Sequence, residues 1–315
     1  MFLMPNKNFS FIEAPIYQGQ KHFGVSLGPS YIRQLLLDQH HQFNLLSTLE
    51  TQSSNTINLS IYEELSYLTE REARRNQLMF IAGGDHSLSI GSIQGLLKCY
   101  PELKVLWIDA HGDINTPESS STQSLHGMPL SMLLGISDHF AKISWFESKL
   151  KPENLIYFGL RDLDPAEKVF LEKYKIQNYT TEDIKRLGLP AVLIKIQNDI
   201  QGQPLHISLD ADAFDPSIAP STGVPVPNGL CYGEVEKLIE GALAVAHVKS
   251  FEYVELNPQI FTDASDVLKT AQTGINLFRL VLEKSNQQEV RHGLDDRFSH
   301  SEKPSLPDSH FEMEK

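Results

Sequence analysis

The sequence predicts an α/β protein, a three-layer αβα sandwich with a mostly parallel central sheet. Short apolar runs alternate along the chain with longer amphipathic segments, and parallel strands need such crossover connections. Three of the apolar runs end in closely spaced acidic and imidazole side chains. In open parallel sheets, ligands bind outside the carboxyl ends of the strands. The sequence therefore predicts both a fold class and a metal site at one edge of the sheet.

Each predicted strand is a short apolar run between turn residues. The strands are expected at Phe9–Ala14, Leu78–Ala82, Lys104–Asp109, Asn154–Gly159, Leu205–Asp210 and Phe251–Leu256. The first has the smallest apolar core, which consists of Phe9, Phe11 and Ile12. Helices are predicted between the strands, at Ser30–Gln39, Ile61–Gln77, Ser87–Tyr100, Pro129–Leu134, Pro165–Lys175, Gly233–Ala246 and Ala264–Lys284.

The chain has 315 residues, a length that α/β proteins often use for one domain. We expect residues 1–284 to form this single domain. Residues 285–315 are mostly polar and show no helical periodicity. They are therefore predicted to be a disordered, solvated C-terminal tail.

Composition and charge limit the classes of partner. A net charge of −13 disfavours nucleic acid and anionic membrane surfaces as partners, and weakly favours a cationic ligand. The two cysteines, Cys99 and Cys231, are too few for a secreted disulfide framework and fit a reducing compartment. The first residues lack the features of a signal peptide, and no apolar run approaches the roughly 20 residues that span a bilayer. We expect a soluble cytoplasmic protein.

Carboxylates and an imidazole recur at spacings of two after two of the strands. Asp109, His111 and Asp113 follow one strand, and Asp210 and Asp212 end another. Residues two apart point the same way where a strand remains extended, so each set is predicted to project together. Each residue could instead cap a strand, pack or form a turn. Clustered buried carboxylates are costly without a cation, which favours a site for one or two divalent metals.

Three further residues are candidates for the same site. His86 follows a strand in Gly83-Gly84-Asp85-His86-Ser87, where Asp85 could orient it. His126 lies in a loop and could transfer protons with a pKa near neutrality, although a surface histidine is the plainer interpretation. Glu255 closes the last strand and could pair with a cationic substrate or merely cap an Asn-Pro turn.

Together these residues resemble the ureohydrolases, the binuclear manganese enzymes that include arginase and agmatinase. The resemblance extends from Phe11 to about Leu280. It rests on three ordered motifs, Gly83-Gly84-Asp85-His86-Ser87, Asp109-Ala110-His111-Gly112-Asp113-Ile114-Asn115-Thr116-Pro117 and Ser208-Leu209-Asp210-Ala211-Asp212-Ala213-Phe214-Asp215-Pro216.

The resemblance implies two manganese ions per subunit, with cobalt or nickel as alternatives. One ion would be held by His86, Asp109, Asp113 and Asp210, and the other by Asp109, His111, Asp210 and Asp212. A hydroxide that bridges the metals would attack the guanidinium carbon, giving urea and an amine. Asp113 would also hydrogen-bond the hydroxide, His126 would transfer protons, and Glu255 would hold the guanidinium group. A homo-oligomer is also implied.

Within this family, several segments look like arginase, the enzyme that converts L-arginine to L-ornithine and urea. By that resemblance, Asn115 and Thr122 would bind the substrate α-carboxylate, and Asp164 and Glu167 its α-ammonium group. Agmatine lacks the carboxylate, so this interpretation favours L-arginine. The alternatives are agmatinase, another guanidino-compound hydrolase, or a catalytically silent metal-binding member.

Three departures from the arginase pattern lie outside the predicted metal ligands, and one of them is the segment Gly135–Glu153 between a helix and a strand. Phe23 stands where arginases usually have glycine, which is expected to alter a loop near the site. Val224 replaces a common threonine and removes a hydroxyl group near the guanidinium end. Substrate affinity and metal preference are therefore the properties that we expect to differ.

Overall fold

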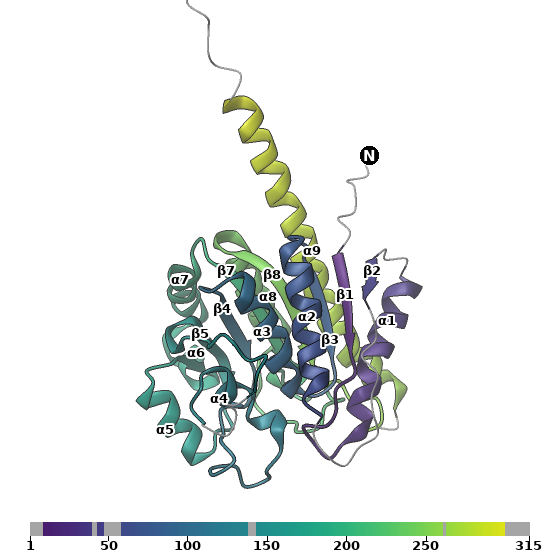
Figure 1. Ribbon diagram of the computed structural model, residues 1–315, viewed down its shortest axis with the longest axis vertical. Coiled ribbons are helices and arrows are strands. Elements are labelled where there is room, and N and C mark those ends of the chain that lie inside the picture. The colour runs from purple at the N-terminus through teal and green to yellow at the C-terminus, as the bar shows by residue number, and fades with distance from the viewer. Residues whose placement is uncertain (1–8, 40–42, 47–57, 138–142, 261–262, 300–315) are drawn as a thin grey trace, which may run out of the picture.

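The computed structural model describes residues 9–39, 43–46, 58–137, 143–260 and 263–299. Within these residues, one open eight-stranded sheet has the order β2-β1-β3-β8-β7-β4-β5-β6 (Figure 1). All of its strand pairs are parallel. The strands are β1 Phe9–Ala14, β2 Phe43–Leu46, β3 Met79–Gly83, β4 Lys104–Ile108, β5 Leu155–Leu160, β6 Gln177–Thr180, β7 Pro204–Asp210 and β8 His247–Val254.

Helices cover both faces of this sheet, which makes three layers (Figure 1). One helical layer packs into the first core and consists of α1 Gly28–Asp38, α6 Thr181–Leu187, α7 Leu189–Ile200, α8 Tyr232–Val245 and α9 Ala264–Ser299. The opposite layer packs into the second core and consists of α2 Ser60–Arg74, α3 Ser89–Cys99, α4 Pro129–Leu133 and α5 Pro165–Lys173. The predicted three-layer α/β fold is confirmed.

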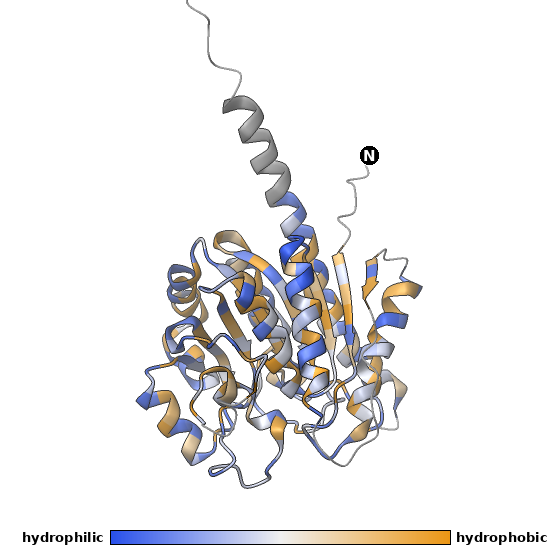
Figure 2. Cartoon of the chain, viewed as in Figure 1, coloured by the Kyte–Doolittle hydropathy of each residue, from blue (hydrophilic) through white to orange (hydrophobic). Residues whose placement is uncertain are grey.

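The two cores follow from the alternation of side chains along each strand. In β3, Phe80 faces the first core and Ile81 faces the second. The rings of Phe80 and Phe278 stack with centroids 4.2 Å apart, which joins the sheet to α9. Apolar residues fill the strands, whereas the outer helix surfaces are more polar (Figure 2). Strands that are buried on both faces have nearly continuous apolar sequences, which is why they could be predicted from the sequence.

Each predicted strand is present, and the differences are two edge strands, two helices and the start of one central strand. The edge strands β2 and β6 escaped prediction because each has only four residues, and β6 reads Gln-Asn-Tyr-Thr. Helices α6 and α7 also escaped prediction. Strand β8 begins at His247, before the predicted start at Phe251. These differences lie away from the strand ends that carry the predicted site.

Helix α9 continues to Ser299, past its predicted end at Lys284 (Figure 1). Residues 285–299 thus lie in this helix, residues 300–315 lie outside the described part of the chain, and the predicted disorder of the tail stays a prediction. A helix that is already nucleated adds one backbone hydrogen bond per residue, so it can extend without an apolar face. The limits predicted for the domain stay a prediction. Among the described residues, no helix is long and apolar enough to cross a membrane.

Candidate metal centre and active site

Four neighbouring strands bring the site together. In the order β3-β8-β7-β4, they occupy the middle of the sheet. His86 lies just beyond β3, Glu255 follows β8, Asp210 ends β7 and Asp109 follows β4. Because the strands are parallel, their carboxyl ends meet at one edge of the sheet. Side chains that are distant in sequence therefore become neighbours.

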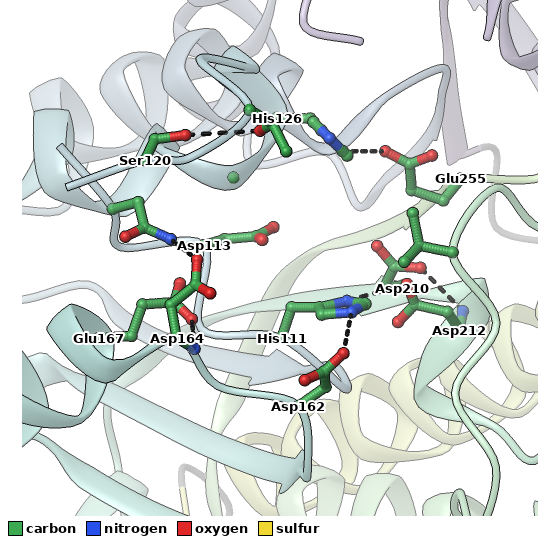
Figure 3. Close-up of a pocket in the computed structure, with 14 residues that line it drawn as sticks. His111, Asp113, Ser120, His126, Asp162, Asp164, Glu167, Asp210, Asp212 and Glu255 are labelled. Carbon is green, nitrogen blue, oxygen red and sulfur yellow. Dashed lines mark hydrogen bonds and ion pairs between the residues drawn. The ribbon is translucent and has the colours of Figure 1, made fainter. Parts of the chain in front are cut away.

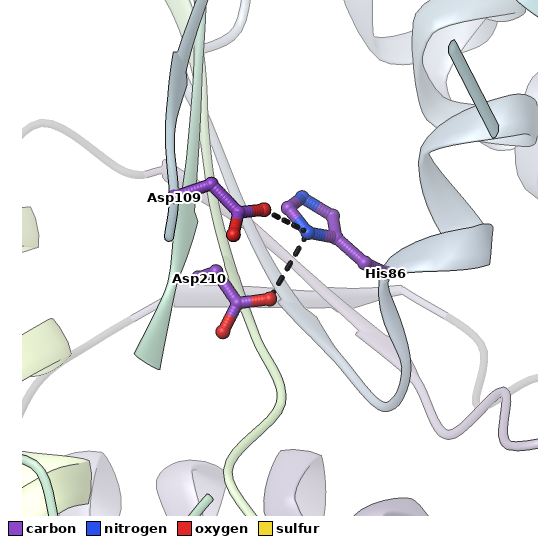
Figure 4. A group of neighbouring side chains, drawn as sticks. All are labelled: His86, Asp109 and Asp210. Atoms are coloured by element: carbon purple, nitrogen blue, oxygen red, sulfur yellow. Dashed lines mark ion pairs between the residues drawn. The ribbon is translucent and has the colours of Figure 1, made fainter. Parts of the chain in front are cut away.

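The first group of possible metal ligands surrounds the Nδ1 atom of His86. This atom lies 3.1 Å from Asp109 Oδ2, 3.2 Å from Asp113 Oδ2 and 3.1 Å from Asp210 Oδ2. Figure 4 shows the ring directed at Asp109 and Asp210. His86 Nδ1 is buried and makes no hydrogen bond. An imidazole nitrogen without a partner, facing several carboxylates, is a donor set suited to a divalent cation.

A second group lies beside the first and shares Asp109 with it. His111 Nδ1 lies 3.1 Å from Asp212 Oδ2 and 3.6 Å from Asp109 Oδ1. Asp109 thus presents one oxygen to each histidine, as a carboxylate that bridges two cations would. The ligand atoms of Asp109, His111 and Asp212 lie within 4.8 Å of one another, and so do those of His86, Asp109 and Asp210. The second bridge, predicted for Asp210, stays a prediction.

Burial and mutual repulsion perturb these groups strongly. Burial raises the pKa of Asp212 to about 6, with a further rise from Asp109 and an opposing effect of His111. Burial and the charges of Asp212 and Asp109 raise the pKa of Asp210 well above its usual value. Burial opposes the charged form of His86, but its carboxylate neighbours raise the pKa well above the usual value. Burial and the carboxylate neighbours thus favour protons on several of these groups, and a divalent cation would compete with those protons for the same atoms.

Unusual backbone geometry presents two of the site residues. Asp113 has φ 49° and Glu255 has φ 64°, in the left-handed region that side chains with a Cβ rarely adopt. At Gly84, an added Cβ would overlap the carbonyl oxygen of Ile16. Asp85 accepts hydrogen bonds from Ser87 N (2.9 Å) and Gly19 N (2.7 Å). The structure gives Asp85 this turn-capping role, in place of the predicted orientation of the His86 ring.

His126 and Glu255 form a pair at the mouth of the metal cluster. His126 Nδ1 lies 3.4 Å from Glu255 Oε1. Burial lowers the pKa of His126, but its interaction with Glu255 dominates and raises it to about 9. The expected pKa near neutrality is therefore wrong for the protein without metal, because the sequence does not reveal the carboxylate partner. Glu255 also accepts hydrogen bonds from Gln20 Nε2 (2.6 Å) and His86 N (3.0 Å).

A pocket of about 190 Å³ opens above these groups (Figure 3). It is lined by His111, Asp113, Asn115, Ser120, Thr122, His126, Gly127, Asp162, Asp164, Glu167, Asp210, Asp212, Val224 and Glu255. Each residue predicted to contact substrate is among them, whereas His86 and Asp109 lie deeper, in the first ligand group. In Figure 3, Asp164 and Glu167 lie across the pocket from Glu255. The pocket thus has a metal end and a second polar end.

At the second polar end, the predicted substrate residues contact one another. Asn115 Nδ2 donates to Asp164 Oδ2 at 2.8 Å. Glu167 accepts from Ile114 N (3.2 Å) and Asp164 N (3.0 Å), so both of its oxygens bind backbone amides. Burial raises the pKa of Glu167 to about 7, with a contribution from Asp113. Its predicted contact with an α-ammonium group stays a prediction, and its hydrogen bonds hold the loops that carry Asn115 and Asp164.

Sequence reasoning missed two residues that support the site: Trp107, which contacts metal ligands, and Gln20, which holds Glu255. Trp107 Nε1 donates to Asp109 Oδ2 at 2.9 Å. The Trp107 ring stacks on His86, with a centroid distance of 3.9 Å and an interplanar angle of 7°. The spacing of two between Trp107 and Asp109 could have revealed this contact. Gln20 carried no comparable signal, because it lies in a loop far from Glu255 in sequence.

Comparison with known proteins agrees with this geometry. The Arginase family model matches residues 7–282. "Arginase-2, mitochondrial" of Rattus norvegicus is 34% identical, with 94% of this chain and 89% of the relative aligned. The crystal structure of arginase from Bacillus subtilis has a TM-score of 0.79 and 34% identity, covering 88% of this chain and 98% of the other. That of Entamoeba histolytica arginase in complex with L-ornithine has a TM-score of 0.77 and 28% identity, covering 88% and 99%. This chain belongs to the arginase family.

Proposed function

We propose that this chain hydrolyses L-arginine to L-ornithine and urea at a centre of two manganese ions. The observation that carries the proposal is the pair of ligand groups that share Asp109. A hydrolase acting on the guanidino group of arginine is supported by the family match and by the identity to arginases over most of the chain.

The donor set fits divalent metals. His86, Asp109, Asp113 and Asp210 would hold one ion, and Asp109, His111, Asp210 and Asp212 the other. The ligands are oxygen and imidazole nitrogen without sulfur, which suits manganese and leaves cobalt and nickel as alternatives. When bound, such ions lower the pKa of a coordinated water toward neutrality and so supply the hydrolytic nucleophile.

Glu255 and His126 would act at the guanidino group. Glu255 is held by Gln20 and His126, so its carboxylate has a fixed position at the pocket wall. A carboxylate there can accept hydrogen bonds from the guanidinium N–H groups of the substrate. His126, with its pKa of about 9, holds a proton at neutral pH. It can pass this proton to the ornithine nitrogen when the bond from that nitrogen to the guanidino carbon breaks.

The second polar end of the pocket supports an amino-acid substrate. Asn115 and Thr122 offer hydrogen-bond donors for the α-carboxylate, and the Asp164 carboxylate can bind the α-ammonium group. Agmatine has an amine but no α-carboxylate, so it could contact only the Asp164 side of this end. A site built around polar substrate groups rejects analogues that lack them, because its own polar groups then lose partners. These residues therefore favour L-arginine over agmatine.

Urea release from L-arginine and from agmatine, measured side by side on manganese-loaded protein, tests the proposal. We expect kcat/KM for L-arginine to be the larger. Preference for agmatine would assign the chain to another ureohydrolase activity. A metal-loaded protein that releases no urea from any guanidino compound would instead be a silent, metal-binding member.

We also propose that the protein is a cytoplasmic homo-oligomer. Its two cysteines, Cys99 and Cys231, are free thiols, which is typical of a reducing compartment. Light scattering during size-exclusion chromatography measures the assembly. A mass of 35.5 kDa, that of one chain, would contradict oligomer formation.

A further inference from the structure

A second buried polar network lies beneath the metal ligands, and the proposed reaction does not use it. Its centre is Glu252 on β8, whose exposed fraction is 0%. The carboxylate accepts hydrogen bonds from Ser92 Oγ (2.5 Å), Ser208 Oγ (2.9 Å) and Ser89 Oγ. His206 Nε2 lies 3.7 Å from its Oε1 atom. A fully buried carboxylate is costly, so this set of donors compensates its desolvation.

Glu252 remains ionised in this environment. Burial alone would raise its pKa, but His206, Ser89 and Ser92 lower it to about 2. An ionised carboxylate can only accept hydrogen bonds. Each hydroxyl that contacts Glu252 must therefore direct its single proton at the carboxylate.

One of these hydroxyls connects Glu252 to the metal centre. Ser208 Oγ lies 2.8 Å from His86 Nε2. Because Ser208 gives its proton to Glu252, it can only accept from His86, so Nε2 must carry a proton. In a neutral imidazole the other nitrogen, Nδ1, then carries the lone pair. Nδ1 is the atom that faces Asp109 and Asp210 at 3.1 Å.

We propose that Glu252 is a positioning residue for the metal centre. Through Ser208 it holds His86 in the form with Nε2 protonated and with the Nδ1 lone pair directed at the cation. The stacked Trp107 ring fixes the plane of the same imidazole. The proposal rests on the metal centre described under Proposed function and adds a residue that touches neither metal nor substrate. Partners of this kind that orient a histidine ligand typically contribute 10- to 100-fold in metal affinity.

The substitution Glu252→Gln tests this assignment with little change of volume. The amide of glutamine can donate to Ser208, which frees the Ser208 proton to face His86 Nε2. The proton of His86 then moves to Nδ1, where the cation should bind. We expect the Kd for Mn²⁺ to rise by about 10- to 100-fold. Ser208→Ala removes the connection without changing Glu252 and should weaken binding similarly.

The chain offers a matched control in Glu72 on α2. It is also a buried carboxylate, 2% exposed, and accepts a hydrogen bond from Ser10 Oγ at 2.8 Å. Its partners Arg71 and Arg75 lie on the same helical segment, away from the metal ligands. Glu72→Gln should therefore lower thermal stability but leave the Kd for Mn²⁺ unchanged. This control separates a general cost of neutralising a buried carboxylate from an effect transmitted to the metal.

The measurement is a titration of the full-length, metal-free chain with Mn²⁺, in which the EPR signal reports the free ion. The wild type, Glu252→Gln, Ser208→Ala, the double variant and Glu72→Gln are compared, with circular dichroism to confirm folding. We expect the double variant to bind Mn²⁺ about as weakly as either single variant, because both interrupt one connection. Unchanged affinity in Ser208→Ala, or additive losses in the double variant, would overturn the positioning role. A wild type that binds no Mn²⁺ would instead overturn the metal centre itself.

Discussion

The metal end of the pocket and its second polar end, which forms the outer rim, are built in different ways. Asp109 and Asp210 stand at the ends of neighbouring strands and are 0% and 3% exposed. Thr122 and Asp164 lie on surface segments, and both are exposed. The sheet thus fixes the groups that activate water, whereas loops carry the groups that would choose the substrate. Changes at the two ends should therefore affect different measurable quantities.

The largest effect is expected at the carboxylate shared by both ligand groups. Asp109→Ala should remove bound metal and lower urea production by roughly 10³-fold or more, since water loses the activation that lowers its pKa from about 15.7 to about 7. Metal analysis of the dialysed protein, with parallel urea assays, checks this. A variant that keeps its full metal content would contradict the bridging role.

His126 lies between the two ends, and its loss should separate turnover from metal binding. His126→Ala is expected to lower kcat by about 10²- to 10⁴-fold, the usual contribution of a positioned acid or base. Metal content should be unchanged because His126 belongs to neither ligand group. If the variant loses metal, His126 is a ligand and its assignment as a proton donor is wrong.

At the outer rim, removal of a single hydroxyl group should change the selection of the substrate and leave the chemical step unchanged. Thr122→Val keeps the shape of the side chain but removes a donor for the α-carboxylate. A hydrogen bond to a charged group contributes about 1.5–3 kcal/mol, so kcat/KM for L-arginine should fall about tenfold or more. Activity with agmatine should stay constant, and an equal fall for both substrates would place Thr122 outside substrate recognition.

The smallest effect concerns stability of the metal-free protein. The pKa of His126 is raised to about 9 in the folded state from an unperturbed 6.5, so its interaction with Glu255 stabilises the fold fully below pH 6.5. This contribution is lost as the pH rises through 9. At pH 6 the melting temperature of His126→Asn should therefore lie a few degrees below that of the wild type. In a protein of this size, each kcal/mol of lost unfolding free energy lowers the melting temperature by about 2–4 °C. The two melting temperatures should converge at pH 10, and a constant gap would refute the linkage.

The sequence predicted the side chains at the strand ends more completely than the contacts that hold and tune them. Asp109, Asp210 and His86 were identifiable because each follows an apolar strand, and parallel strands bring such ends together. The link between Gln20 and Glu255 has no local pattern, since it joins a loop to a distant strand end. The pKa of His126 depends on that same carboxylate, so spacing alone could not reveal it. The four-residue strand β6 and the length of α9 escaped prediction because context outweighs propensity in such segments.

The order of strands in the sheet also determines when the metal centre can form during folding. The hydrogen bond from His86 N to Glu255 Oε1 joins residues 169 positions apart in the chain. Such non-local pairings are made late and slowly, because the entropy of loop closure must be overcome first. The ligands on β3, β4 and β7 thus meet only when the central strands have docked. Bound metal should consequently slow unfolding of the completed sheet and leave the rate of folding nearly unchanged.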